Sequence, residues 1–153
     1  MFTQLKWTKP FKVEYKRLTD KAVCPRRGST EAAGWDLFST AAYDIAPHST
    51  VPVGTGLAIA LPKGTFGAIF ARSGLALKKG LRPANCVGVV DSDYRGEIIV
   101  ALHNDTDEMV SIEENTRIAQ LVVMPYMDIR PCEVYSLDDT ERGANGFGST
   151  GEH

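Results

Sequence analysis

Apolar and polar residues alternate along much of this chain, and this pattern limits the folds that it can adopt. A period of two residues is typical of strands with one buried face. Turn-forming sequences such as Leu61-Pro62-Lys63-Gly64 separate the alternating segments. Short strands joined by such turns predict an all-β fold, a jelly-roll-like β-sandwich or barrel. The alternating segments are residues 11–16, 57–61, 66–70, 98–102 and 118–124.

Two segments differ from this pattern. Ser73 to Lys79 has the composition of one short helix of about two turns. The last eighteen residues, Ser136 to His153, hold only three apolar residues among charged residues and glycines, too few to order the segment by burial. Because 153 residues suffice for one domain core and not for two, we expect a β domain over residues 1–136 and a mobile C-terminal arm over residues 137–153.

Composition excludes several classes of protein. No run approaches the ~18 apolar residues of a transmembrane helix, and a net charge of −2 without a basic run gives no field for nucleic acid, so we expect neither membrane nor nucleic acid as a partner. The three cysteines are scattered and odd in number, which argues against a disulfide scaffold or zinc ribbon. With no secretory signal in the first ten residues, a cytoplasmic protein is expected.

The glycine-rich tail contains Gly146-Phe147-Gly148-Ser149-Thr150-Gly151, which matches the dinucleotide pattern G-x-G-x-x-G. That pattern requires a following helix, and only two residues follow here, so we reject a Rossmann site. Glycine N–H groups can still wrap phosphate oxygens, and Arg142 and Phe147 add a forked cation and a flat apolar face. The composition of the tail therefore predicts either a lid over a nucleotide or a plain flexible terminus.

Five short segments follow one another along the chain: Ala33-Gly34-Trp35-Asp36-Leu37, Arg72-Ser73-Gly74-Leu75-Ala76, residues 88–97 (GVVDSDYRGE), Arg117-Ile118-Ala119-Gln120-Leu121 and residues 142–151 (RGANGFGSTG). In this order they resemble the five motifs of the trimeric deoxyuridine triphosphatases (dUTPases), over about residues 11–151. The resemblance implies a jelly roll assembled as a homotrimer with shared active sites. It also implies dUTP diphosphatase activity with magnesium, which converts dUTP to dUMP and pyrophosphate, keeps uracil out of DNA and supplies dUMP for thymidylate synthesis.

The second motif joins a guanidinium, a hydroxyl and an amide at the start of the predicted helix, where the helix dipole favours anions. The resemblance assigns Arg72, Ser73 and Gly74 to phosphate contacts. Ser73 alone also fits a helix N-cap. The departure from the family here is Ala71, which stands where proline is usual and removes no ligand group.

Gln120 lies on an alternating strand, on the same face as Ile118 and Val122. A buried amide belongs either to a polar network in the core or to a ligand contact, and the resemblance places Gln120 beside the phosphates. Arg117, on the opposite face, is expected to be structural.

Metal-ligating residues are not clustered in this sequence, and the three histidines lie far apart, so a zinc site is not expected. Magnesium is commonly held by substrate phosphates and waters with one or two carboxylates assisting. The resemblance implies that Asp36 is this carboxylate and acts through water, whereas an Asx turn beside Gly34 is its structural alternative.

Recognition of base and sugar is expected from Asn85 through Tyr94, where the apolar run that ends at Val90 and its neighbouring glycine and asparagine permit a tight hairpin. Backbone groups of this segment, including Val90, can pair with the uracil edge. The resemblance implies that Asn85 contacts the base and that Tyr94 lies under the deoxyribose and excludes a 2′-hydroxyl. Ordinary strand packing is the alternative for Tyr94.

Asp91 and Asp93 are two residues apart and would share a face if their strand were regular. The resemblance assigns the first, Asp91, as the general base that deprotonates a water for attack at the α-phosphorus. It gives Asp93 no such role.

The resemblance implies that the arm closes the site, with Phe147 stacked over the uracil and Arg142 close to the terminal phosphate. Gly148 and Ser149 supply further substrate contacts. Asn145 stands where glycine is frequent in the family.

Two other functions remain open from the sequence. One is a dCTP deaminase-like enzyme of the same superfamily, which would release ammonia. The other is a nucleotide-binding regulatory module without catalysis.

Overall fold

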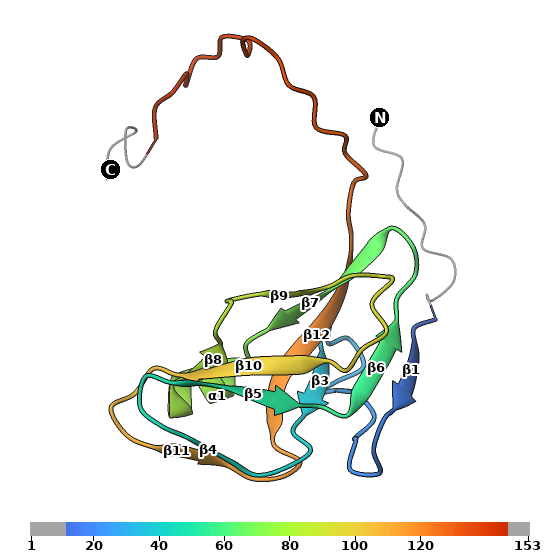
Figure 1. Cartoon of the computed structure of the whole chain (residues 1–153), viewed down its shortest axis with the longest axis vertical. Helices are drawn as coiled ribbons and strands as arrows, with labels where there is room; N and C mark the ends of the chain where they lie inside the picture. Colours follow the sequence, from blue (N-terminus) through green and yellow to red (C-terminus); the bar gives the residue numbers. More distant parts are fainter. Residues whose placement is uncertain (1–11, 147–153) are drawn as a thin grey trace.

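Short strands surround one apolar core in this computed structural model, which describes residues 12–146 (Figure 1). Within these residues a single helix, α1 (Ser73–Lys79), interrupts the strands. The strands are β1 (Glu14–Arg17), β2 (Arg26–Arg27), β3 (Trp35–Phe38), β4 (Tyr43–Ile45), β5 (Thr50–Gly54), β6 (Leu57–Ala60), β7 (Thr65–Phe70), β8 (Leu81–Pro83), β9 (Gly88–Val90), β10 (Ile99–Asn104), β11 (Val110–Ile112) and β12 (Arg117–Pro125).

All strand pairs are antiparallel. The largest sheet has the order β2-β3-β12-β7-β9, and a second sheet has the order β5-β10-β8. Two further pairs, β1-β6 and β11-β4, complete the arrangement. Leu37 on β3, Leu121 on β12 and Leu102 on β10 meet in the core between the sheets. The prediction of an all-β, jelly-roll-like fold with one short helix is confirmed.

The helix α1 begins and ends where the sequence predicts. Gly80, in the left-handed conformation with φ 60°, ends it and donates its N–H to the carbonyls of the last turn. Only Leu75 of the helix is buried. With seven residues, α1 is far shorter than a bilayer span, and it is the sole helix of the described chain.

Alternation predicts burial well in β10 and poorly in β1. Val100 and Leu102 are buried, as the pattern of residues 98–102 predicts, and so is Ile98 just before the strand. By contrast, all four residues of β1 are exposed, and Val13 just before the strand is partly buried against the core. The predicted half-buried strand at residues 11–16 is therefore confirmed for Val13 and wrong for Tyr15, and Phe11 lies outside the described residues.

A β-bulge changes the facing of side chains along β12. The register against β3 shifts between Arg117 and Ala119, so one extra residue lies on β12 at this point. Ile118 before the shift and Ala119 and Leu121 after it are all buried in the core. The prediction that Gln120 shares a face with Ile118 is therefore wrong, because the bulge moves Gln120 away from the core face.

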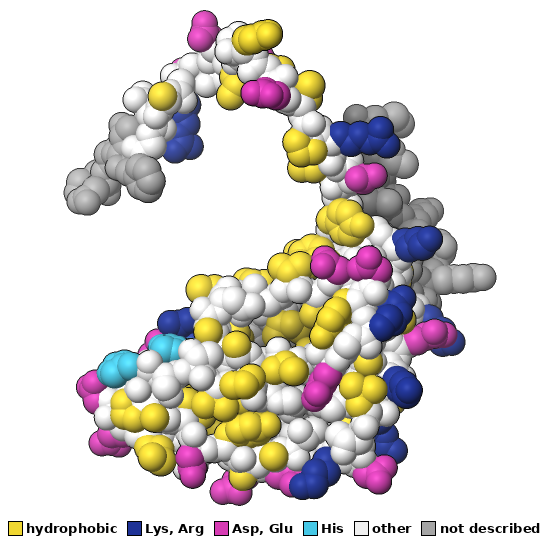
Figure 2. Space-filling model, in the orientation of Figure 1, with side chains coloured by type: hydrophobic (Ala, Val, Ile, Leu, Met, Phe, Trp, Pro, Cys, Tyr) yellow, Lys and Arg dark blue, Asp and Glu magenta, His cyan; other side chains and the backbone are white. Residues whose placement is uncertain are grey.

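After Pro125 the chain leaves the β domain as an extended segment that arcs away from the sheets (Figure 1). Every residue from Met127 to Asn145 is exposed. Its apolar side chains stand out from the chain in Figure 2, and they include Met127, Ile129, Val134, Tyr135 and Leu137, each at least 55% exposed. Phe147, Gly148 and Ser149 of the predicted lid lie outside the described residues.

Asn104, at the end of β10, is fully buried and joins three parts of the fold. Its Nδ2 donates to the carbonyls of Ile45 (3.0 Å) and Glu108 (2.7 Å), and its Oδ1 accepts from the Thr106 N–H (2.9 Å). We expect Asn104→Ala to lower the free energy of unfolding by about 2–4 kcal/mol, because it leaves buried backbone groups without partners. Urea unfolding measures this loss. Glu108→Ala, which removes only an exposed side chain, should stay within about 0.5 kcal/mol of the parent, and an equal loss in both variants would contradict this role for Asn104.

Candidate active site

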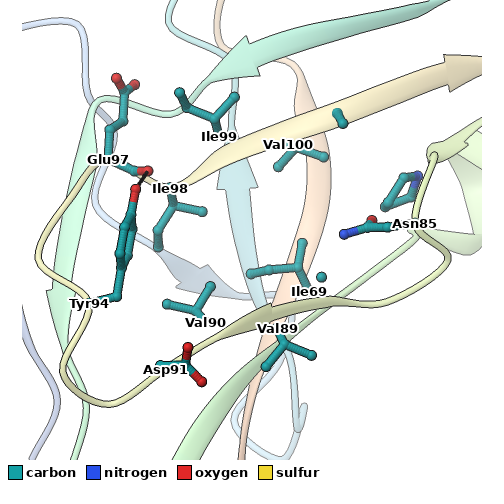
Figure 3. A pocket seen from close by; sticks show the side chains of 13 residues that line it. Ile69, Asn85, Val89, Val90, Asp91, Tyr94, Glu97, Ile98, Ile99 and Val100 are labelled. Atoms are coloured by element: carbon teal, nitrogen blue, oxygen red, sulfur yellow. Dashed lines mark hydrogen bonds between the residues drawn. The ribbon is translucent and has the colours of Figure 1, made fainter.

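A pocket lies between β9 on one side and the start of β10 on the other, with a cavity of about 270 Å³ (Figure 3). Four residues predicted for base, sugar and catalysis line it together: Asn85, Val90, Asp91 and Tyr94. Ile69 of β7 and Ile98 form much of the apolar wall. The structure thus gathers residues that the sequence placed in one functional segment.

The backbone that forms this pocket differs from the predicted hairpin. β8 pairs with β10, whereas β9 pairs with β7, so the chain crosses from one sheet to the other between Pro83 and Gly88. The turn depends on Cys86, which has φ 61°, and the Cys86 N–H donates to the carbonyl of Pro83 (3.1 Å). The hairpin prediction is wrong because each half of the segment finds its partner in a different sheet.

This crossing leaves β9 at the edge of its sheet. Among the described residues, β9 pairs with β7 alone, and its other edge faces the pocket. An edge strand presents N–H and C=O groups that need partners. A flat ligand with donors and acceptors along one edge can supply them, as an added strand would.

Asp91 lies directly after β9 in a turn, where its carbonyl accepts the Tyr94 N–H (3.2 Å). Asp91 and Asp93 are therefore not on a regular strand, and the condition for their sharing a face is not met. Asp91 is exposed and borders both the pocket and a second groove, which Lys63, Asp93 and Tyr126 also line. Its carboxylate is accessible to solvent and to a ligand that extends out of the pocket.

The Tyr94 ring forms one wall of the pocket, with its hydroxyl donating to the carbonyl of Glu97 (3.0 Å; Figure 3). Gly96 permits this position, since a Cβ there would overlap the phenol. Tyr94 is 46% exposed, so the ring is not an ordinary core residue.

A second cluster is centred on Asp36 of β3, which is buried at 8% exposure. Arg72 donates from Nε to Asp36 Oδ1 (2.8 Å), and Arg117 donates from Nη1 to Asp36 Oδ2 (3.3 Å). The sequence predicted neither contact, and the bulge in β12 that places Arg117 on this side leaves no mark on the periodicity. With two guanidinium groups for one carboxylate, the cluster carries excess positive charge.

Gln120 lies opposite Asp36 in the strand register and donates from Nε2 to the carbonyl of Ala71 (2.9 Å). A Cβ at Gly34 would lie 2.5 Å from the Gln120 Oε1, so glycine there makes room for the amide. Gln120 thus supports the turn that carries Arg72 into α1.

Ser73 and Gly74 are exposed at the start of α1. The N-cap of the helix is Arg72, and no side chain caps it, so Ser73 does not have the N-cap role that the sequence left open. Its hydroxyl is available to a ligand.

The two clusters lie far apart within one chain. Gln120 of β12 pairs with both Asp36 of β3 and Phe70 of β7, so Asp36 lies level with Phe70. Val90 of β9 pairs with Gly67 of β7, so Asp91, the next residue, lies level with Phe66. Three strand spacings (about 14 Å) and four residues along a strand (about 13 Å) therefore separate them, or about 20 Å in all. Groups that serve one phosphate must lie within hydrogen-bond reach of it, so these two clusters of a single chain cannot act on the same phosphate.

The dUTPase family model matches residues 20–151 of this chain. The chain belongs to the dUTPase family. The deoxyuridine 5′-triphosphate nucleotidohydrolase of Corynebacterium diphtheriae is 49% identical over 144 residues, which cover 94% of this chain and 95% of that protein. The mouse enzyme of the same name is 44% identical over 92% of this chain and 86% of its own.

The structure resembles that of the dUTPase of Staphylococcus bacteriophage 80alpha with dUpNHpp, with a TM-score of 0.85 and 27% identity over 92% of this chain and 98% of that one. The match to the dUTPase family model does not favour either alternative that the sequence left open, the dCTP deaminase-like enzyme or the purely regulatory module.

Arg142, the first residue of the dUTPase arm motif, is exposed and donates from Nε to the carbonyl of Asn145 (2.9 Å). This local turn is the only hydrogen bond of its side chain within residues 12–146. In a single chain the guanidinium is therefore directed to the arm itself and not to the pocket.

We expect Asp36→Asn to lower the free energy of unfolding by about 1–3 kcal/mol, because it leaves Arg72 and Arg117 beside a neutral amide. Urea unfolding at a fixed protein concentration measures the change. Asp20→Asn alters the same type of side chain at an exposed position and should have almost no effect. Equal stability of Asp36→Asn and the parent would show that the two guanidinium contacts contribute nothing.

Proposed function

We propose that this chain is a dUTP diphosphatase, which hydrolyses dUTP to dUMP and pyrophosphate by attack of water on the α-phosphorus. The observation that carries the proposal is the edge of β9 that no strand within residues 12–146 pairs with, along a pocket that the exposed Asp91 also lines. In a cell this reaction keeps uracil out of DNA and supplies dUMP for thymidylate synthesis.

Base selection rests on the shape and polarity of the pocket. The backbone groups of Val90 and its neighbours on β9 pair with the uracil edge, and the Asn85 amide, which approaches Gly88, adds a side-chain contact. Cytosine presents a donor where uracil presents an acceptor, and it would leave a buried group unpaired. Such mismatches can lower kcat/KM by ~10⁴-fold.

Sugar selection rests on Tyr94. Its ring lies along the pocket wall and packs under the deoxyribose, in the space that a 2′-hydroxyl would need. The Tyr94 hydroxyl already donates to the Glu97 carbonyl, so the phenol does not need the substrate as a partner.

Asp91 acts as the general base. It takes a proton from the water that attacks the α-phosphorus, and pyrophosphate leaves with the electron pair of the broken P–O bond. Arg72, with the exposed hydroxyl of Ser73 and the N–H of Gly74, stabilises the negative charge on the phosphates. Gln120 maintains the turn that presents these groups and lies beside the phosphates.

A magnesium ion, when bound, neutralises phosphate charge. Within residues 12–146, no group of three histidine, cysteine or acidic side chains is placed to hold a metal ion. Both Asp36 oxygens already accept from guanidinium groups. These residues fit an ion that the triphosphate and water hold, with Asp36 assisting through water.

We further propose a homotrimer in which neighbouring chains share each site. The separation of about 20 Å between Asp36 and Asp91 supports this, because a complete site then needs Asp91 of one chain and Arg72 of another. The exposed apolar residues of the extended segment after Pro125, from Met127 to Leu137, support it too, since a monomer leaves them in water.

The arm, which we assign to residues 137–153 beyond a β domain of residues 1–136, closes this shared site. Arg142 reaches the terminal phosphate, Phe147 covers the uracil, and Gly148 and Ser149 contact the substrate. Closure excludes water and strengthens the charge interactions inside. A cytoplasmic location is supported by the three cysteines, none of which is paired.

Release of pyrophosphate from dUTP, dTTP, dCTP and UTP, each with and without magnesium, tests the proposed activity. We expect dUTP to be the preferred substrate by at least ~10²-fold and magnesium to stimulate its hydrolysis. Absence of dUTP turnover, or equal cleavage of dTTP, contradicts the proposal. Ammonia released from dCTP would instead indicate a deaminase.

Asp91→Asn should bind dUTP but lose about 10²–10⁴-fold in kcat, because the amide cannot accept the proton of the water. Single-turnover kinetics and calorimetric binding separate these two effects. Asp93→Asn is the matched control: Asp93 is exposed in the same loop, and its variant should keep kcat within a few-fold of the parent. Near-normal turnover by Asp91→Asn would rule Asp91 out as the base.

A further inference from the structure

Glu97 lines the pocket but is not part of the chemistry described above. Figure 3 shows its carboxylate directed away from Val90 and Asp91, whereas its backbone carbonyl receives the Tyr94 hydroxyl. The carboxylate Oε1 accepts the N–H of Gly56 in the turn between β5 and β6, at 2.7 Å. Glu97 therefore connects this turn, through its own backbone, to the tyrosine that forms the pocket wall.

The contacts on both sides of this connection are close. A Cβ at Gly54 would lie 2.7 Å from the Glu97 Oε1, and a Cβ at Gly96 would overlap the Tyr94 phenol. Glycine at these two positions allows the carboxylate to reach the turn and the ring to reach the Glu97 carbonyl. A short bond from a backbone N–H to a carboxylate is stronger than one between neutral groups.

The next residue is held independently of the Glu97 side chain. The Ile98 N–H donates to the carbonyl of Leu57 (2.8 Å), and the Ile98 carbonyl accepts from the Thr55 hydroxyl (2.7 Å). Loss of the Glu97 carboxylate therefore leaves the start of β10 attached to the β5–β6 turn. It releases the backbone of residue 97, whose carbonyl sets the position of the Tyr94 ring.

We propose that Glu97 is a positioning residue for sugar selection: its carboxylate, bound to the Gly56 N–H, fixes the carbonyl that holds Tyr94 against the place of the sugar 2′ position. This inference rests on the proposed hydrolysis of dUTP and names the device that excludes UTP. Glu97 itself does not take part in the reaction and acts only through Tyr94.

The test is the ratio of kcat/KM for dUTP to that for UTP. Glu97→Ala should lower this ratio by about tenfold, the change expected for the net loss of one hydrogen bond. Glu97→Gln keeps an oxygen that accepts the Gly56 N–H and should restore most of the ratio. Tyr94→Phe keeps the ring and removes the hydroxyl, so it should lower the ratio by a similar factor, and Glu97→Ala added to it should cause little further loss.

Thr55→Val is the control for a general loss of stability. It removes the hydroxyl that binds the Ile98 carbonyl in the same turn but does not touch the link from Glu97 to Tyr94. Its melting temperature should fall while its substrate ratio stays within twofold of the parent. An unchanged ratio in Glu97→Ala or in Tyr94→Phe, or an equal fall in Thr55→Val, overturns the role of Glu97.

Failure of the proposed function is seen separately, in the parent protein's turnover of dUTP. A second readout needs no turnover: the NMR signals of the Tyr94 ring should show one ordered orientation in the parent and averaged orientations in Glu97→Ala. An equally ordered ring in both proteins contradicts the positioning role.

Discussion

β9 pairs with β7 along one edge and leaves the other to the pocket, and the rest of the site depends on this arrangement. Because the chain passes from β8 in one sheet to β9 in the other, the backbone between them opens a space instead of closing a hairpin. The free edge then offers peptide groups to a planar base. Asp91 follows directly after this strand, so the proposed base recognition and the proposed general base depend on the same few residues.

The same sheet sets the position of the cluster that we propose to bind phosphate. Asp36 lies level with Phe70 because both pair with Gln120 of β12, and Arg72, just after β7, and Arg117, at the start of β12, both contact Asp36. The strand spacing and register of this sheet separate the Asp36 cluster from Asp91 by about 20 Å. In the proposed reaction the two clusters come from different chains, and the exposed apolar residues from Met127 to Leu137 are available for contact between those chains.

Local features of this protein could be predicted from sequence, and non-local ones could not. The bounds of α1 follow from its composition and from Gly80, and the burial of Val100 and Leu102 follows from alternation. Motif order gathered Asn85, Val90, Asp91 and Tyr94 correctly into one pocket. The bulge in β12 and the pairing of β9 with β7 depend on contacts between distant segments, which no local period records. For that reason the facing of Gln120 and the contact of Arg117 with Asp36 were found only in the structure.

Subunit mixing tests most directly whether each site combines two chains. Asp91→Asn and Arg72→Ala proteins, each nearly inactive alone, are unfolded together and refolded as a mixture, and dUTP hydrolysis is compared with that of each variant refolded by itself. Shared sites predict that the mixture regains substantial activity, because some sites then pair an intact Asp91 with an intact Arg72 from a neighbour. A mixture no more active than its two components would contradict the shared site.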